Sequence, residues 1–244
     1  MSFLAGKDLT KTSLKGILLP LRGFAAEVNA INLAFHLAEP RKTPVLMLHC
    51  QQDGEDEVQK GWLGRVTAYA RSLSTALGVP SLSMEAKEQN PADAIIHAAE
   101  REHADLIVMT AMRWSAHKHI LGAVSREVVR RGKVATLVVV SWLEDFKDQP
   151  ELVLSKILLP LHDLDEDAAA LQLAAALRES SAGRNTELIA LNVTVLPAIV
   201  PMTATDLPEF RHQKERFLGA AKGFMDKTGM KLTVKHVNAR TAEH

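Results

Sequence analysis

The sequence contains two copies of one segment, and this duplication constrains the fold more than any local pattern does. A run ILLPL occurs at residues 17–21 and again at 157–161, so Pro160 follows Pro20 after 140 residues. The likeness continues into TPVLMLHC at 43–50 and TELIALNV at 186–193. Self-similarity at a separation of one domain length indicates a duplicated structural unit. We therefore expect two units that share one order of strands and helices.

In the first unit, short apolar runs alternate with segments of helical periodicity. The runs expected to form strands are 16–21, 45–50, 81–86, 105–109 and 135–140. Between the first two runs the helical stripe is Phe24, Val28, Ile31 and Phe35, and between the next two it is Val58, Trp62, Val66, Tyr69, Leu73 and Leu77. Nearly continuous apolar strands that alternate with helices predict a Rossmann-like α/β fold, with a parallel sheet and helices on both faces.

Capping residues mark the ends of the later helices. Asn90 followed by Pro91 is typical of an N-cap and first helical residue, and Asp93 suits the first turn. A further helix, through Leu121, Val124 and Val128, is expected to end before Gly132. The acidic run 53–57 lacks the full calcium-loop pattern, so we interpret it as the first turn of the second helix.

The second unit repeats the first only in part. It supplies a strand at 156–161, a helix through Leu173 and Leu177, a strand at 187–193, a helix at 209–229 and a strand at 231–237. The sequence then stops where the third helix of the repeat should begin, which suggests a fragment or a truncated second copy. We expect one domain at 1–141, a linker at 142–154 and a partial second domain at 155–244. The first strand of this partial domain should have a free edge.

Composition excludes several classes of protein. Lys+Arg and Asp+Glu both number 29, so the chain has no broad basic surface for nucleic acid. Cys50 is the single cysteine, which excludes an intramolecular disulfide and favours a reducing compartment. The apolar runs are far shorter than the roughly 20 residues of a membrane helix, and residues 1–13 lack the apolar run expected of a signal peptide. We expect a cytoplasmic protein without direct membrane insertion.

The first unit resembles the universal stress protein family over roughly residues 13–141. The family's first strand ends in Pro-Val-Asp-Gly, matched here by PLRG at 20–23, and its fourth strand reads DLIVMG, matched by DLIVMT at 105–110. The segment ILGAVSREVVRRGKVATLVVV is similar to the family's closing helix and strand. The resemblance implies strand order 3-2-1-4-5, an ATP site with a glycine-rich phosphate loop, and pairing of subunits through the fifth strand.

The sequence departs from the family at the loop that would hold phosphate. Thr110 and Arg113 stand where the resemblance places two glycines, and Gly122-Ala123 stands where it places Gly-Ser or Gly-Thr. Arg22, and His162 in the second unit, replace the adenosine-contacting aspartate. Side chains here obstruct the convergence of backbone N–H groups on phosphate, and arginine cannot accept a hydrogen bond. ATP is therefore not expected in the family's usual pose, and no cofactor is expected.

Two interpretations of this edge of the sheet remain open. One is an anion site built from charged side chains, namely those of Arg22, Arg113, Lys118 and a neighbouring histidine. The other, which we favour, is a loop that no longer binds a ligand. If the edge binds a ligand, the candidate ligand-contacting residues are Arg22, Gly23, His49, Thr110, Arg113, Gly122, Ala123 and Ser125. His117-Lys118-His119 lacks the further ligands that zinc needs, and we interpret Cys50, next to His49, as a buried thiol. No G-x-S-x-G motif supports hydrolase chemistry.

The leading hypothesis is a non-enzymatic universal stress protein that acts through protein partners or a ligand other than ATP. The alternatives are an ATP- or AMP-binding stress protein with an arginine-assisted phosphate site, and the cytoplasmic regulatory domain of a transporter. An apolar segment at 193–210, with Ile199, Val200 and Met202, would be costly to expose. Together with the free strand edge, it predicts a homodimer or a larger parent protein.

Overall fold

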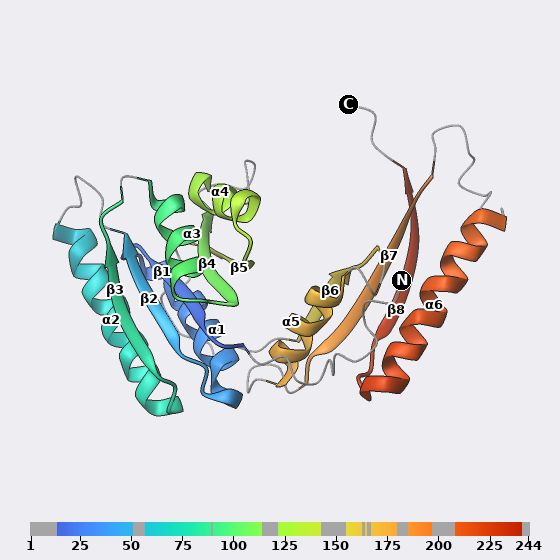
Figure 1. Ribbon diagram of the computed structural model, residues 1–244, viewed down its shortest axis with the longest axis horizontal. Coiled ribbons are helices and arrows are strands. Elements are labelled where there is room, and N and C mark those ends of the chain that lie inside the picture. The colour runs from blue at the N-terminus through green and yellow to red at the C-terminus, as the bar shows by residue number, and fades with distance from the viewer. Residues whose placement is uncertain are drawn as a thin grey trace. The chain divides into compact units, whose positions relative to one another are not determined.

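The computed structural model describes residues 14–50, 57–88, 90–113, 122–142, 155–162, 164, 167–179, 185–196 and 208–240. The chain forms two compact units, one built mainly from Ser13–Leu152 and the other mainly from Val153–His244. We call them the first and second units (Figure 1). Of the helices described, none combines the length and the apolar character needed to cross a membrane.

The first unit contains a five-stranded parallel sheet in the order β3-β2-β1-β4-β5, which confirms the expected 3-2-1-4-5 topology. The central strand β1 pairs with β2 from Ile17↔Val45 to Leu21↔His49. The strands are β1 (Ile17–Leu21), β2 (Val45–Cys50), β3 (Ser81–Ala86), β4 (Leu106–Arg113) and β5 (Ala135–Trp142). The apolar run of β1 suits this central place, because Ile17, Leu18 and Leu19 are all 0% exposed.

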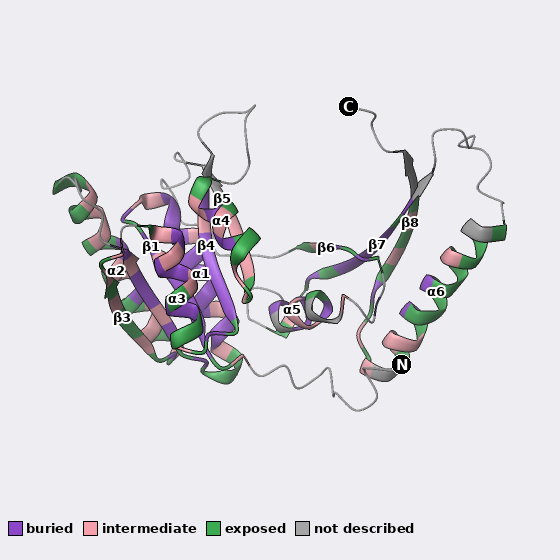
Figure 2. Cartoon of the chain, turned by 45° about the horizontal axis from the view of Figure 1, so that its top comes forward, coloured by how far each residue is buried: buried purple, intermediate pink, exposed green. Residues whose placement is uncertain are grey.

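Four α-helices cover the two faces of this sheet. They are α1 (Val28–Ala38), α2 (Glu57–Leu77), α3 (Pro91–Arg101) and α4 (Ala123–Arg131), with the short 3-10 helices η2 (Ala25–Glu27) and η3 (Glu39–Arg41) flanking α1. Helices α3 and α4 pack on the face that carries Leu18 and Leu48. Helices α1 and α2 contact each other, and right-handed crossovers place them on the opposite face. The buried residues accordingly concentrate in the strands and the inner sides of the helices (Figure 2).

The second unit contains a three-stranded parallel sheet in the order β6-β7-β8. Its elements are β6 (Lys156–Pro160), α5 (Ala168–Glu179), β7 (Glu187–Leu196), α6 (Pro208–Thr228) and β8 (Thr233–Arg240). Leu159, Leu188 and Ala190 form a core with residues of both helices. Within the part of the chain that the structure describes, β6 has β7 as its single neighbour, so the expected free edge is present.

Several predicted boundaries and one predicted core residue are wrong. The first α-helix begins at Val28, since Phe24 is instead the extended residue before η2. Val58 is 69% exposed, because it lies in the first turn of α2, whose buried residues, Val66 and Ala70, come later. Strand β7 continues to Leu196 through its pairing with β8, so residues 193–196 are not loop. Ile199, Val200 and Met202 lie outside the described residues.

The cap of α3 is confirmed. The side-chain oxygen Oδ1 of Asn90 accepts a hydrogen bond from the backbone N–H of Ala92 at 2.9 Å, and Pro91 is the first helical residue. Helix α3 in turn presents Ile95, Ala98 and Ala99 to the core. The cap therefore stabilises the helix that covers one side of the central strands.

We expect Asn90→Ala to lower the free energy of unfolding of the first unit by about 1 kcal/mol, because it leaves a helix N–H without its acceptor. Urea denaturation followed by circular dichroism measures the change. Asn90→Ser, which retains a capping oxygen, is the matched control and should stay near the wild type. Equal losses in both variants would show that the cap does not contribute in this way.

Candidate functional site

The candidate site lies at the carboxyl-terminal edge of the first sheet, where the chain crosses from one side to the other between β1 and β4. In parallel α/β sheets this switch point is the usual place for ligands. Strands β1 and β4 pair at Ile17↔Leu106 and Leu18↔Ile107, and beyond that point β1 continues along β2 and β4 along β5. The short helix η2 contacts both β4 and β5 at this edge.

The loop after β1 is organised around the side chain of Glu27, the last residue of η2. Its Oε1 accepts a hydrogen bond from the N–H of Arg22 at 2.7 Å. Its Oε2 accepts from the N–H groups of Gly23 at 3.0 Å and Phe24 at 3.1 Å. Glu27 is 5% exposed, so its carboxyl group fills a cradle of three consecutive backbone donors in a buried position. Such a cradle is the kind of nest that elsewhere binds an anionic ligand.

Burial raises the pKa of Glu27 above the ordinary range of a glutamate, and the three backbone hydrogen bonds oppose this shift. His49 also favours the charged carboxylate, to a smaller extent. Because burial has the largest effect, the pKa of Glu27 is raised overall.

The second unit repeats part of this arrangement. Asp167 occupies the position of Glu27 in the repeat, and its Oδ2 accepts a hydrogen bond from the N–H of His162 at 2.7 Å, as Glu27 accepts from Arg22. Glu27 is not among the site residues predicted from the sequence. The signal that could have found it is the acidic residue at the same place in both copies, 140 residues apart.

Gly23 is required by geometry. Its φ of +90° favours glycine, and a Cβ placed on it would lie 2.6 Å from the carbonyl oxygen of Gln59 and 3.0 Å from the backbone nitrogen of Leu63. Both atoms belong to the backbone of α2, so the loop after β1 packs closely on that helix. The side chain of Gln59 also donates to the carbonyl oxygen of Arg22 at 3.0 Å.

The structure brings Arg22, Gly23 and His49 together at the ends of β1 and β2. The Nδ1 atom of His49 lies 3.3 Å from the carbonyl oxygen of Leu21, the last residue of β1. The guanidinium of Arg22 is exposed and lies over the ring of Phe24, with its Cζ 5.4 Å from the ring centroid. Asn192 repeats the role of His49 in the second unit, because its Nδ2 donates to the carbonyl oxygen of Leu161 at 3.1 Å.

Thr110 and Arg113 lie in strand β4, which corrects their placement in a loop. Thr110 pairs with Val139 of β5, and Arg113, at the end of the strand, pairs with Trp142. The sheet extends through these residues because this segment contains no glycine or proline to end the strand. The Oγ1 atom of Thr110 is buried and has no hydrogen-bond partner among the described residues. The segment 114–121, with His117, Lys118 and His119, lies outside the described residues.

Gly122, Ala123 and Ser125 lie at the start of α4. Gly122 is the N-cap with φ of −65°, and a Cβ there would meet nothing within 4 Å, so the surrounding protein does not itself require glycine. Ala123 is exposed as the first helical residue, and Ser125 is buried at 4% exposure. These residues lie at the start of α4, whereas Arg22, Gly23 and His49 lie at the ends of β1 and β2. The segment that joins β4 to Gly122 lies outside the described residues.

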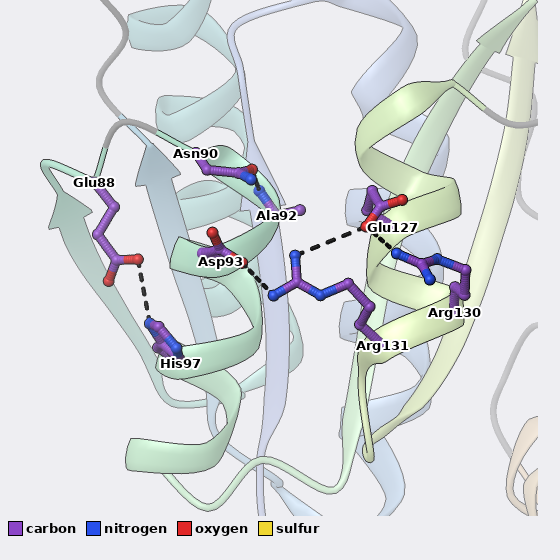
Figure 3. A network of polar contacts seen from close by, with 8 residues as sticks. All are labelled: Glu88, Asn90, Ala92, Asp93, His97, Glu127, Arg130 and Arg131. Atoms are coloured by element: carbon purple, nitrogen blue, oxygen red, sulfur yellow. Dashed lines mark hydrogen bonds and ion pairs between the residues drawn. The ribbon is translucent and has the colours of Figure 1, made fainter.

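An ionic network holds the other end of α4 against α3 (Figure 3). Arg131 Nη2 lies 2.7 Å from Asp93 Oδ1 of α3, an ion pair whose geometry does not meet that of a hydrogen bond. Arg131 and Arg130 also pair with Glu127 on α4, at 3.7 Å and 2.8 Å. The Arg130 guanidinium and its hydrogen bond lower the pKa of Glu127. This network positions α4 but lies on the surface, so we assign it no ligand.

Other candidate chemistry is not supported among the described residues. Cys50 is buried at 8% exposure, and burial raises the pKa of its thiol to about 11, which makes it a poor nucleophile. In the part of the chain that the structure describes, no three histidine, cysteine, aspartate or glutamate side chains gather in a way that could hold a metal ion.

The fold and the sequence identify the class of protein. The family model of the universal stress protein family matches residues 14–140. The chain therefore belongs to the universal stress protein family. No protein among curated sequences matches it significantly.

Solved structures agree with this fold. A universal stress protein from Archaeoglobus fulgidus DSM 4304 is similar with a TM-score of 0.56 and 15% identity, over 92% of this chain and 77% of that one. A functionally unknown protein from Pseudomonas aeruginosa PAO1 has a TM-score of 0.57 and 14% identity, over 95% of this chain and 75% of that one. The Archaeoglobus fulgidus universal stress protein solved in complex with dAMP is 16% identical, with a TM-score of 0.41, over 52% of this chain and 97% of that one.

We expect Glu27→Gln to lower the free energy of unfolding of the first unit by about 1–3 kcal/mol, because an amide nitrogen cannot accept the backbone N–H groups. The loss should depend on pH. A pKa raised in the folded state means that the folded protein binds more protons than the unfolded chain, so wild-type stability falls as pH rises through the folded pKa. The difference between wild type and variant should therefore narrow from pH 5 to pH 8, as measured by urea titrations. A difference that widens would show that the backbone donors outweigh desolvation.

Gly23→Ala tests the close approach to α2. We expect it to destabilise the first unit by about 1–3 kcal/mol, because it combines an unfavourable φ with a clash against backbone atoms that cannot move independently. Thermal unfolding measured by calorimetry gives the change. Gly122→Ala, at a position with free space, is the matched control, and a similar loss there would contradict the argument.

Proposed function

We propose that this chain is a non-catalytic binding module of the universal stress protein family whose first unit does not hold ATP in the family's usual pose. It acts instead through contact with proteins or through a ligand other than a nucleoside triphosphate. The observation that carries the proposal is the carboxyl group of Glu27, which accepts the N–H groups of Arg22, Gly23 and Phe24 at the switch point.

The chemistry of this edge disfavours a phosphate or ribose at the end of β1. Both carboxyl oxygens of Glu27 are engaged, so the three backbone donors are not available to a ligand unless Glu27 leaves its buried place. A ligand hydroxyl that needs an acceptor would meet the exposed guanidinium of Arg22, which only donates. A displaced carboxylate would also repel phosphate.

One alternative has support of its own. The buried Oγ1 of Thr110 has no hydrogen-bond partner among the described residues, and Gly122 is a glycine that the surrounding protein does not require. Both features, with the arginine at position 22, suit a nucleotide that binds in an altered pose along β4 and the start of α4. In that case Thr110→Val and Arg22→Ala would weaken nucleotide binding.

The test is a direct search for bound nucleotide. Freshly purified protein is heat-denatured, with and without prior incubation in millimolar ATP, and the supernatant is analysed by mass spectrometry. We expect no stoichiometric ATP, ADP or AMP, and no change in melting temperature with any of the three. Glu27→Ser, which empties the cradle, is the comparison variant and should gain affinity for ATP if Glu27 is what excludes it.

Stoichiometric nucleotide in the wild type would overturn the proposal. If that nucleotide is lost in Thr110→Val and Arg22→Ala, the altered-pose alternative replaces it. Measurable ATP hydrolysis that disappears in the same variants would contradict the non-catalytic assignment as well.

A further inference from the structure

The sheet of the second unit has one covered face. Along its strands, Leu159 of β6 and Leu188 and Ala190 of β7 point to this face and join one apolar cluster. Both helices contribute to the same cluster, with Leu171 and Ala174 from α5 and Phe217 and Ala221 from α6. Since side chains alternate along a strand, the residues between these belong to the opposite face.

The opposite face carries exposed apolar side chains, with the exposed charged residues Lys156, Glu187 and Lys235 among them. Leu158 is 56% exposed on β6, Val193 is 37% exposed on β7, and Val237 is 47% exposed on β8. The register places Val193 beside Val237, and Leu158 beside Ile189, which is 9% exposed. We call Leu158, Val193 and Val237 the open face. Exposed apolar side chains on neighbouring strands typically mark an interaction surface.

The first unit shows what covers the same face of the repeat. Leu18, Leu48 and Cys50, at the positions that correspond to Leu158, Leu191 and Val193, are 0%, 1% and 8% exposed. They are buried by α3 and α4, which present small and branched side chains: Ala92, Ile95, Ala98, Ala99 and Val128. Leu158 and Val193 are therefore exposed in the second copy, whereas their counterparts Leu18 and Cys50 are buried in the first.

The free edge of β6 indicates what kind of segment would bind here. In the first unit that edge of β1 pairs with β4, at Ile17↔Leu106 and Leu18↔Ile107, and β4 directly follows α3. In the second unit no described strand pairs with this edge of β6. A second copy stacked sheet on sheet would cover the open face but leave the edge unpaired. A helix followed by a strand satisfies both.

We propose that the second unit binds a partner polypeptide that supplies an amphipathic helix with an alanine- and isoleucine-rich face, followed by an apolar strand. The helix packs on the open face, and the strand pairs in parallel with β6, as α3 and β4 do in the first unit. The inference concerns a different unit from the proposed function and does not depend on whether the first unit binds a nucleotide.

The probe is a fluorescein-labelled peptide of residues 90–113, the chain's own α3–β4 segment, added to the full chain. Fluorescence anisotropy should show saturable binding, at least tenfold weaker for Leu158→Glu and Val237→Glu. Leu82→Glu, at a residue 57% exposed on β3 of the first unit, is the matched control and should bind as the wild type does. A peptide with Ile95→Asp should not bind. Hydrogen exchange should slow at the backbone amides of β6 when the peptide is bound.

Three results would overturn the proposal. The first is no binding of the peptide to the wild type. The second is binding that Leu158→Glu and Val237→Glu leave unchanged, with circular dichroism confirming that the variants are folded. The third is a dimer, seen by light scattering without peptide and abolished by Leu158→Glu, because this would make a second copy of the chain the occupant.

Discussion

The structure depends on one constraint, which is that an apolar parallel strand must be covered on both of its faces. The run ILLPL gives β1 side chains that are buried on either side, and the first unit meets the requirement with two pairs of helices. Each buried leucine of this kind contributes roughly 2 kcal/mol. The second unit carries the same run in β6 but covers one face, so Leu158 is exposed where Leu18 is buried. The difference between the two copies follows from covering layers rather than from the strands themselves.

The backbone at the end of the first strand presents a second shared requirement. A chain that leaves a strand and turns into a helix exposes several N–H groups that need acceptors. Here the protein supplies the acceptor itself, from Glu27 in one unit and Asp167 in the other. Because these hydrogen bonds are made within the protein, the turn has a defined shape without a ligand. It also means that a binding site at this edge must be built from what remains, chiefly the side chains of Arg22 and His49 and the residues along β4.

Much of the fold could be predicted from the sequence, because the duplicated strands and the caps each have a local cause. Asn90 and Gly132 mark helix ends by chemistry that acts within a few residues, and both are confirmed. The site was less predictable. Thr110 was expected in a loop by resemblance, but pairing with β5, far along the chain, keeps it in a strand. Glu27 was missed because its partners are backbone groups, which leave no sequence pattern apart from the repeat. Val58 shows the related limit that periodicity does not reveal where along a helix burial begins.

Cys50 makes the two units differ in their reaction with thiol reagents. The thiol is buried in the same apolar cluster as Leu48 and Ile107, and with a pKa of about 11 it stays protonated in neutral solution. The chain has one cysteine, so the second unit has none. Alkylating reagents therefore report the opening of the first unit alone, while probes of the whole backbone report both. The protein thus contains its own internal label for separating the unfolding of one repeat from that of the other.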